Sequence, residues 1–229
     1  MAKEAGAELI NLSKQPTRKL LLGGRAVDMP TVLLDEVDVI VSMPVPKVHV
    51  LTRYTGAIKN QWGLIPTDMR LRLHYQIDHI LVDLLTKLPP QAVVMDGSYF
   101  LDDSGPIEGT AVAMGIMITA NHPIVADVVA LRLMGWDASD IRHVSRAVQQ
   151  FGFEPGSLEA LPPRSARRFK LRRTFWNWVA LAGFNSRLLT YVGYESPLAR
   201  PLRVAKIASE RVLGKRTIAH RRSDESGES

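Results

Sequence analysis

Cations and hydrogen-bond donors crowd the stretch PKVHVLTRYTGAIKNQWGLIP at positions 46–66, which contains no carboxylate. Its positively charged or imidazole side chains are Lys47, His49, Arg53 and Lys59. Ammonium and guanidinium groups form charge-assisted hydrogen bonds with phosphate and carboxylate oxygens, so this stretch is suited to an anionic ligand. A solvated basic loop is the alternative interpretation of the same four residues.

The same stretch adds an amide, a hydroxyl and glycines to its cations. Asn60 follows Lys59 directly, so a carboxamide stands beside a point charge. Gly56 and Gly63 permit a close approach between backbone and ligand, because they carry no Cβ. We therefore expect the anionic group to be bound by residues of this stretch, namely Lys47, Arg53, Thr55, Gly56, Lys59 and Asn60.

Two histidines and an aspartate are candidates for proton transfer or metal binding. His49 lies within the cationic stretch, and His74 stands four residues before Asp78 on an expected helix. A histidine held by a carboxylate is a competent base or metal ligand, and a surface ion pair is the alternative. Asp96 ends an expected strand, where a carboxylate can bind a metal, orient a histidine or cap a turn. The candidate catalytic set is therefore His49, His74 and Asp96, with a divalent metal left open.

Composition excludes several classes of site. The chain of 229 residues has no cysteine, which excludes disulfides, thiolate zinc sites, iron–sulfur clusters and cysteine nucleophiles. The P-loop, GxGxxG, HExxH and GxSxG motifs are absent as well. The N-terminal stretch lacks the apolar core of a signal peptide, and the longest apolar runs are shorter than the roughly 18–20 residues that span a bilayer. We therefore expect a cytoplasmic protein.

Strand and helix patterns alternate along residues 1–155, which favours an α/β domain. The expected strands are 7–12, 18–24, 37–43, 91–97 and 111–120, and the expected helices are 67–88, 123–134 and a last one ending near 151. The β-branched run at 37–43 is typical of a strand buried in a parallel sheet, where ligands bind beyond the carboxyl ends of the strands. We expect a mostly parallel sheet flanked by helices, with the site at those ends.

Charge divides the chain into a mildly acidic body and a basic C-terminal third. Residues 164–229 contain 15 Lys and Arg against 5 Asp and Glu, although the whole chain has a net charge of only +6. We expect a linker at 156–163, a basic helical extension at 164–220 and a disordered tail at 221–229.

Five cations between positions 167 and 173 precede Phe175, Trp176 and Trp178 in the basic extension. Such a segment is suited to lying in the headgroup layer of a membrane, and packing of the tryptophans on the body is the alternative. The aromatic residues follow the cations and do not alternate with them, which disfavours a nucleic-acid partner.

Five motifs recur along the body of the chain in a recognisable order. They are PVPKVHVLTRYTGAIKNQWGLIP, VMDG, GPIEGT, MGIMITANHPIVADVVALRLMG and IRHVSRAVQQFG. In this order they resemble the uncharacterised domain-of-unknown-function 362 family, over about Lys3 to Gly152. The resemblance maps the family's pattern onto Pro46, Lys47, His49, Thr55, Gly56, Lys59, Asn60, Gly63, Asp96, Gly97, Gly105, Pro106, Gly109 and Asp127. On this basis Gly97 and Gly105 join the expected ligand-binding residues.

The chain departs from the family pattern in two ways. Many relatives carry ferredoxin-type cysteine motifs, and their absence here argues against an electron-transfer role. Relatives also usually begin with a further strand–helix segment carrying a Lys-Pro-Asn-like motif, and this chain starts after it. We therefore expect an unpaired sheet edge, covered by self-association or by a partner chain.

We expect an enzyme-like protein that binds an anionic small molecule bearing phosphate or carboxylate. Lys47 and Lys59 would hold the anionic group, and His49 or His74 would move a proton or bind a metal. One alternative is a metabolite-binding protein that uses the same residues without turnover. The other is a peripheral membrane adaptor that acts through the basic extension.

Overall fold

The structure, a computed structural model, describes residues 3–154, 168–192 and 196–197. The strands in these residues are β1 (Thr17–Leu22), β2 (Arg25–Pro30), β3 (Val41–Ser42), β4 (Lys47–His49), β5 (Arg53–Thr55), β6 (Ala92–Asp102) and β7 (Thr110–Ala120). The α-helices are α1 (Ala57–Asn60), α2 (Thr67–Leu73), α3 (Ile77–Lys87), α4 (Pro123–Leu133), α5 (Arg142–Gln150), α6 (Phe175–Asn185) and α7 (Arg187–Thr190). The expected linker at 156–163, the expected tail at 221–229 and most of the extension at 164–220 lie outside the described residues.

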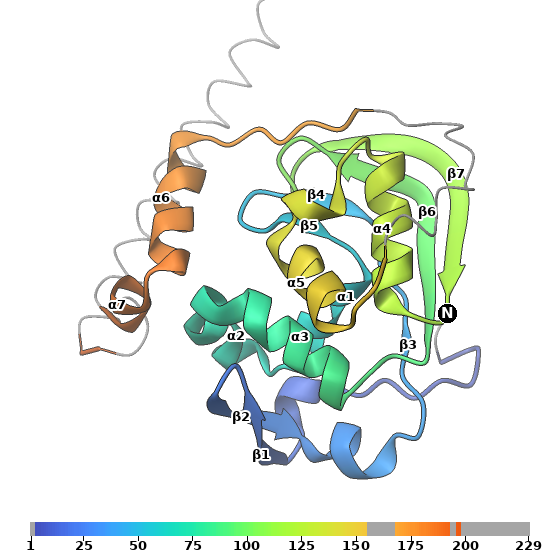
Figure 1. The fold of residues 1–229 in the computed structure, drawn as a ribbon. Helices are drawn as coiled ribbons and strands as arrows, with labels where there is room; N and C mark the ends of the chain where they lie inside the picture. The colour runs from blue at the N-terminus through green and yellow to red at the C-terminus, as the bar shows by residue number, and fades with distance from the viewer. Residues whose placement is uncertain (1–2, 155–167, 193–195, 198–229) are drawn as a thin grey trace, which may run out of the picture.

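The central sheet is organised around β6. β3 and β4 run parallel to β6 along one of its edges, and Pro44 and Pro46 separate these two short strands. β7 runs antiparallel along the other edge, and β5 pairs antiparallel with β4. Of the five strands that the described residues contribute to this sheet, β3, β4 and β6 share one direction. The expected α/β class, with a mostly parallel sheet flanked by helices, is confirmed (Figure 1).

Three expected strands differ from those in the structure. The buried strand expected at 37–43 is present only as Val41–Ser42, and Val39, Val41 and Met43 are 59%, 50% and 72% exposed, because among the described residues this segment pairs only with β6 and one face of the sheet is open. Residues 7–12 form no strand, because this exposed segment pairs with no other strand among the described residues. The strand expected at 18–24 is present as β1, but it forms a separate hairpin with β2. Gly23 and Gly24 make the tight turn between them, with φ values of 57° and 72° that favour glycine.

Helices cover one face of the central sheet and form the core with it (Figure 1). α4 packs on β6 and β7, and α3 packs on α5. The buried stripe of α3 has the expected helical spacing, with Ile77, Ile80, Leu81 and Leu84 directed inward. The helix expected over 67–88 is, however, interrupted by a 3₁₀ turn at His74–Gln76, labelled η4, between α2 and α3.

The opposite face of the sheet is exposed to solvent in the described part of the chain. Large apolar side chains on this face include Met43, Tyr99 and Met117, the last of them 68% exposed. Among the described residues β7 pairs only with β6, so its second edge is also open. An apolar sheet face beside an open edge strand favours contact with another protein surface.

We expect the chain to self-associate through this face and edge. Met117→Lys should lower the apparent mass measured by light scattering at high protein concentration, because it places a charge in the centre of the apolar face. Leu71→Lys, which places the same charge on α2, should leave the mass unchanged. A wild-type chain that stays monomeric over the whole concentration range would contradict this expectation.

Candidate functional site

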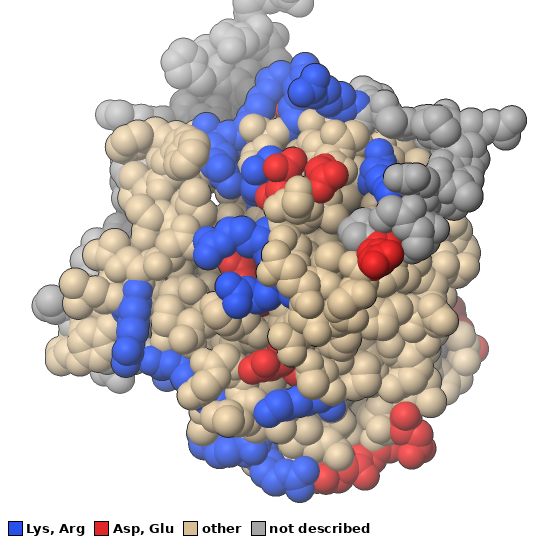
Figure 2. All heavy atoms as spheres, in the orientation of Figure 1, with Lys and Arg blue, Asp and Glu red and all other residues tan. Residues whose placement is uncertain are grey.

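A small cavity lies where the β4–β5 turn, η4, α5 and α6 meet. Its volume is about 150 Å³. It is lined by Leu51, Thr52, Arg53, His74, Ile77, Asp78, Arg142, Arg173, Leu181 and Asn185. Three arginines against one aspartate make the lining positively charged, and we refer to it as the cationic cavity. Figure 2 shows Lys and Arg side chains gathered around a hollow on this face of the molecule.

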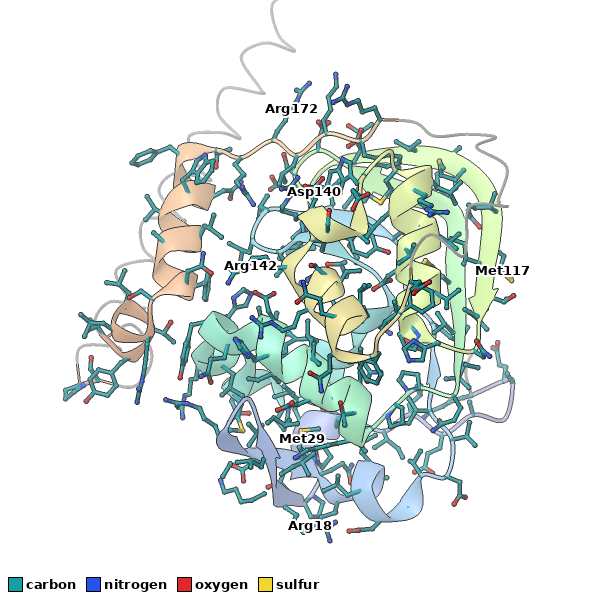
Figure 3. All side chains as sticks on the ribbon, in the orientation of Figure 1. Arg18, Met29, Met117, Asp140, Arg142 and Arg172 are labelled. Atoms are coloured by element: carbon teal, nitrogen blue, oxygen red, sulfur yellow. The ribbon has the colours of Figure 1, made fainter. Side chains whose placement is uncertain are left out.

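Each arginine of the cationic cavity is held by a different contact. The Arg53 guanidinium lies 5.9 Å from the centre of the Trp136 ring. Arg173 donates its Nε–H to the Val50 carbonyl oxygen at 2.6 Å. Arg142 extends from the start of α5, where its Nε lies 3.3 Å from Oδ2 of Asp78 (Figure 3). A guanidinium has five N–H donors, so these contacts leave donors for an anion.

Next to His74, the cavity adjoins a group formed by one amine and three imidazoles. We refer to Lys59, His49, His74 and His143 as the amine–imidazole cluster. Lys59 extends from α1, and its Nζ donates to Oγ1 of Thr55 at 3.3 Å. Burial lowers the pKa of all three imidazoles, and the positive charge of Lys59 lowers it further.

The three imidazoles of the cluster are neutral at pH 7. Burial, and then the charge of Lys59, lowers the pKa of His49 to about 2, of His74 to about 4 and of His143 to about 3. The Nδ1 atom of His49 accepts hydrogen bonds from the backbone N–H groups of Leu51 and Thr52, at 3.1 and 3.3 Å. The proton of the neutral His49 ring therefore lies on Nε2.

The pKa of the Lys59 amine lies close to neutral pH. Burial, followed by repulsion from the charge of Lys47, lowers the pKa of Lys59 from 10.5 to about 7. Near neutral pH the amine is therefore divided between its charged and neutral forms. A bound anion would favour the ammonium, whereas the neutral amine could accept a proton.

Several buried polar atoms of this region have no hydrogen-bond partner among the described residues. They include both ring nitrogens of His143, which is completely buried, and Nδ1 of His74. The Oδ1 atom of Asp78 is 4.0 Å from Nδ1 of His143, too far for a good hydrogen bond. Buried polar groups are ordinarily paired, and of these two residues only His74 lines the cavity, where a polar ligand could pair with its Nδ1 atom.

The backbone N–H groups that follow Gly56 hold an internal carboxylate. Asp127, completely buried on α4, accepts hydrogen bonds from the N–H groups of Ala57 and Ile58 at 2.6 and 3.0 Å and from the Tyr54 hydroxyl at 3.1 Å. Burial raises the pKa of Asp127 to about 7, against the opposing effect of these hydrogen bonds. A Cβ at Gly56 would collide with the Tyr54 hydroxyl and the Asp127 carboxylate. Gly56 therefore admits a side chain of the protein where we had expected a ligand.

Of the other expected ligand-binding residues, Arg53 lines the cationic cavity, whereas Asn60, Gly97 and Gly105 make contacts within the body. The Nδ2 atom of Asn60 donates to Oγ of Ser42 at 3.0 Å, which ties α1 to β3. A Cβ at Gly97 would lie 2.6 Å from the Ile116 side chain, and one at Gly105 would collide with the carbonyl group of β4 residue Val48. Both glycines thus permit close packing between segments of the body.

Asp96 lies apart from the other two expected catalytic residues. Strand β6 continues for five residues beyond Gly97, so Asp96 is not at a strand end. It is exposed on the open face, opposite Met117 of β7, and its Oδ1 accepts from the N–H of Ser98 at 2.9 Å. His49 and His74 are each largely buried, unlike Asp96.

The expected pairing of His74 with Asp78 is also absent from the described residues. The four-residue spacing would place both on one side of a continuous helix, but η4 interrupts the helix between them. Asp78 instead contacts Arg142 and His143.

Sequence reasoning missed three residues of the site: Arg142, His143 and Arg173. In IRHVSRAVQQ, His143 lies beside Val144 and one helical turn before Ala147, and α5 buries all three. This spacing could have indicated that His143 faces the interior. Arg173 carried no local signal, because its contact with Val50 spans 123 residues of sequence.

A metal site is not supported by the arrangement of side chains. In the part of the chain that the structure describes, no group of three or more His, Asp or Glu residues is placed to hold a metal ion. The converging groups are cations and neutral imidazoles, which favour an anion.

Comparisons with known proteins identify the family. The profile of a family described as a domain of unknown function (DUF362) matches residues 1–132, more than half of the chain, and the chain therefore belongs to this family. One relative is the thylakoid-associated protein sll1697 of Synechocystis sp. (strain ATCC 27184 / PCC 6803 / Kazusa), 23% identical over 140 residues. The match covers 58% of this chain and 43% of that protein, so the chain spans less than half of the relative's length. No solved structure matches the chain.

The internal carboxylate predicts different roles for two glycines of one motif. Gly56→Ala should lower the free energy of unfolding by at least about 2 kcal/mol, because the methyl group would displace Asp127 from its donors. A Cβ at Gly63 has no atom within 4 Å, so Gly63→Ala should change the free energy by less than about 0.5 kcal/mol. Urea unfolding measures both variants, and equal effects would contradict the structural role of Gly56.

Proposed function

We propose that this member of the domain of unknown function 362 family binds a small molecule through a phosphate or carboxylate group in the cationic cavity. The observation that carries the proposal is a cavity lined by three arginines and by His74, whose Nδ1 atom is buried and has no hydrogen-bond partner among the described residues. Arg142 and Arg173 would hold the anionic group at the cavity, and the charge of Lys59 would stabilise it from behind His74.

Proton transfer is the chemical step that these groups could add to binding. A general base works best when its pKa is close to the working pH, and Lys59 meets that condition. His74 lines the cavity as a neutral ring and could accept or relay a proton. A metabolite-binding protein without turnover would use the same residues, and the proposal therefore commits to binding and leaves the reaction class open.

Sulfate is a suitable first probe, because its charge does not change near neutral pH. At about ten times its Kd, sulfate should raise the Tm of the wild type by about 4 °C, since a ligand that binds only the folded state stabilises it. Lys59→Met should reduce this rise to less than about 1 °C. Lys19→Met, which removes an exposed ammonium of the β1–β2 hairpin, should retain the rise.

The same measurement has an expected pH dependence. Lys59 has a lower pKa in the folded chain than in the unfolded chain, so the stability that it contributes is lost as pH falls through about 7. A bound anion raises this pKa, so the stabilisation by sulfate should be largest below pH 7 and should shrink as pH rises above it. An equal Tm rise in the wild type and Lys59→Met at every pH would exclude Lys59 from the site.

Peripheral membrane association is a second candidate function, supported by the surface of α6. Phe175, Trp178 and Val179 lie on one exposed side of this helix, and five Lys and Arg with no acidic residue occur between positions 168 and 192. Among the described residues, every helix is too short or too polar to span a bilayer. The name of the relative, thylakoid-associated protein sll1697, fits contact with a membrane surface.

Co-sedimentation with lipid vesicles tests this second function. The wild type should sediment with anionic vesicles but not with neutral ones, and added salt should release it. Trp178→Ala should weaken binding about fivefold or more, because tryptophan favours the headgroup layer. Tyr99→Ala on the open sheet face is the matched control, since Tyr99 and Trp178 are 59% and 55% exposed. Protein left in the supernatant with anionic vesicles at low salt would contradict membrane association.

A further inference from the structure

Helix α6 lines part of the cationic cavity and is apolar over much of its length. Leu181 lines the cavity, and the Phe184 ring lies 4.8 Å from the His74 ring. Phe175 and Trp178, nearer the start of the helix, are exposed, and Trp178 lies one turn before Leu181 on the same face. The helix therefore contributes side chains to the cavity and presents exposed aromatic side chains beside it.

Arg173 connects the cavity to the exposed aromatic side chain of Trp178. Its guanidinium lines the cavity, donates to the Val50 carbonyl, and lies 4.9 Å from the centre of the Trp178 ring. The exposed indole and the cavity arginine are thus in direct contact. A surface that received Trp178 would lie immediately beside the cavity.

The size of the cationic cavity limits what it can enclose. Its volume of about 150 Å³ is below the roughly 300–1,000 Å³ of pockets that bury a whole drug-sized ligand. It has room for a small anionic group, so the remainder of a larger ligand would lie outside, beside α6. Leu51, Ile77 and Leu181 add apolar surface to the lining.

We infer that the anionic group bound in the cationic cavity is the headgroup of a membrane lipid, presented by the bilayer on which α6 docks. This inference rests on the proposed anion-binding function of the cavity. The chemistry shared with a free metabolite is a phosphate or carboxylate group. A lipid is favoured over a free metabolite because tryptophan prefers the headgroup layer of a bilayer. With Trp178 in that layer, Arg173 and the cavity would lie at the depth of the headgroups. The cations of the segment before α6 would add general attraction to an anionic surface.

Two arginines of this region form a matched pair for the test. Arg142 and Arg172 are 77% and 72% exposed, and each lies near one aspartate, at 3.3 and 3.2 Å. Arg142 lines the cavity, whereas Arg172 lies on the segment before α6 and does not line it (Figure 3). Replacing either one removes the same charge, but only Arg142 would contact the headgroup.

The experiment compares the full-length wild type, Arg142→Ala and Arg172→Ala on phosphatidylcholine vesicles that contain phosphatidic acid or phosphatidylserine. Both variants should bind anionic vesicles about fivefold more weakly, because each loses one positive charge that attracts the anionic surface. Arg142→Ala should lose a further tenfold or so on at least one of the two lipids, because it also loses a charge-assisted hydrogen bond. Leu181→Trp, which fills the cavity without changing the charge, should show the same selective loss and provides a second measurement if Arg142→Ala folds poorly.

A parallel arm measures the Tm shift caused by glycerol 3-phosphate and by sulfate. If these soluble anions stabilise the wild type but not Arg142→Ala, while the two arginine variants bind all vesicles equally, the headgroup inference is overturned and the proposed anion site stands. If neither soluble anions nor vesicles distinguish the variants, both are overturned. Selective loss of vesicle binding by Arg142→Ala and Leu181→Trp supports the headgroup inference.

Discussion

The buried carboxylate of Asp127 is the interaction on which the site depends. It joins α4 to the start of α1 through the N–H groups of Ala57 and Ile58, and to β5 through the Tyr54 hydroxyl. α1 has only four residues and could not stay helical on its own, so its direction is set by this anchor. The anchor therefore determines where Lys59, two residues beyond Ala57, places its amine.

Burial is the main cause of the electrostatics of the cluster, and the position of that amine adds to it. A buried cation is unfavourable unless an anion pairs with it, and burial holds Lys59 near its neutral form. Burial, followed by the charge of Lys59, also keeps the three imidazoles neutral. In the proposed function, an anion entering the adjoining cavity would relieve this repulsion, and it would supply the countercharge to a positive environment formed by the protein. Helix α6, which lines the cavity, would then restrict the direction from which the ligand can enter.

Local sequence patterns predicted the elements whose partners are close by and missed what depends on distant contacts. The apolar run of β7 and the proline start of α4 were recognisable because each is encoded within one segment. Asp96 was misplaced because the pairing of β6 with β7 carries the strand past a glycine that would otherwise end it. The concentration of cations was recognisable in the sequence at Lys47, Arg53 and Lys59. No local pattern could show that Gly56 faces Asp127, which lies 71 residues further along the chain.

The central claim is that Lys59 is a buried amine whose missing countercharge is supplied by a bound anion. A nitrogen-15 NMR titration of the Lys59 side chain measures this directly, with a Lys59→Met sample to assign the signal. The account predicts a pKa of about 7 in the free protein and a clear rise when sulfate saturates the site. A pKa close to the ordinary lysine value of about 10.4, or one that sulfate leaves unchanged, would contradict it.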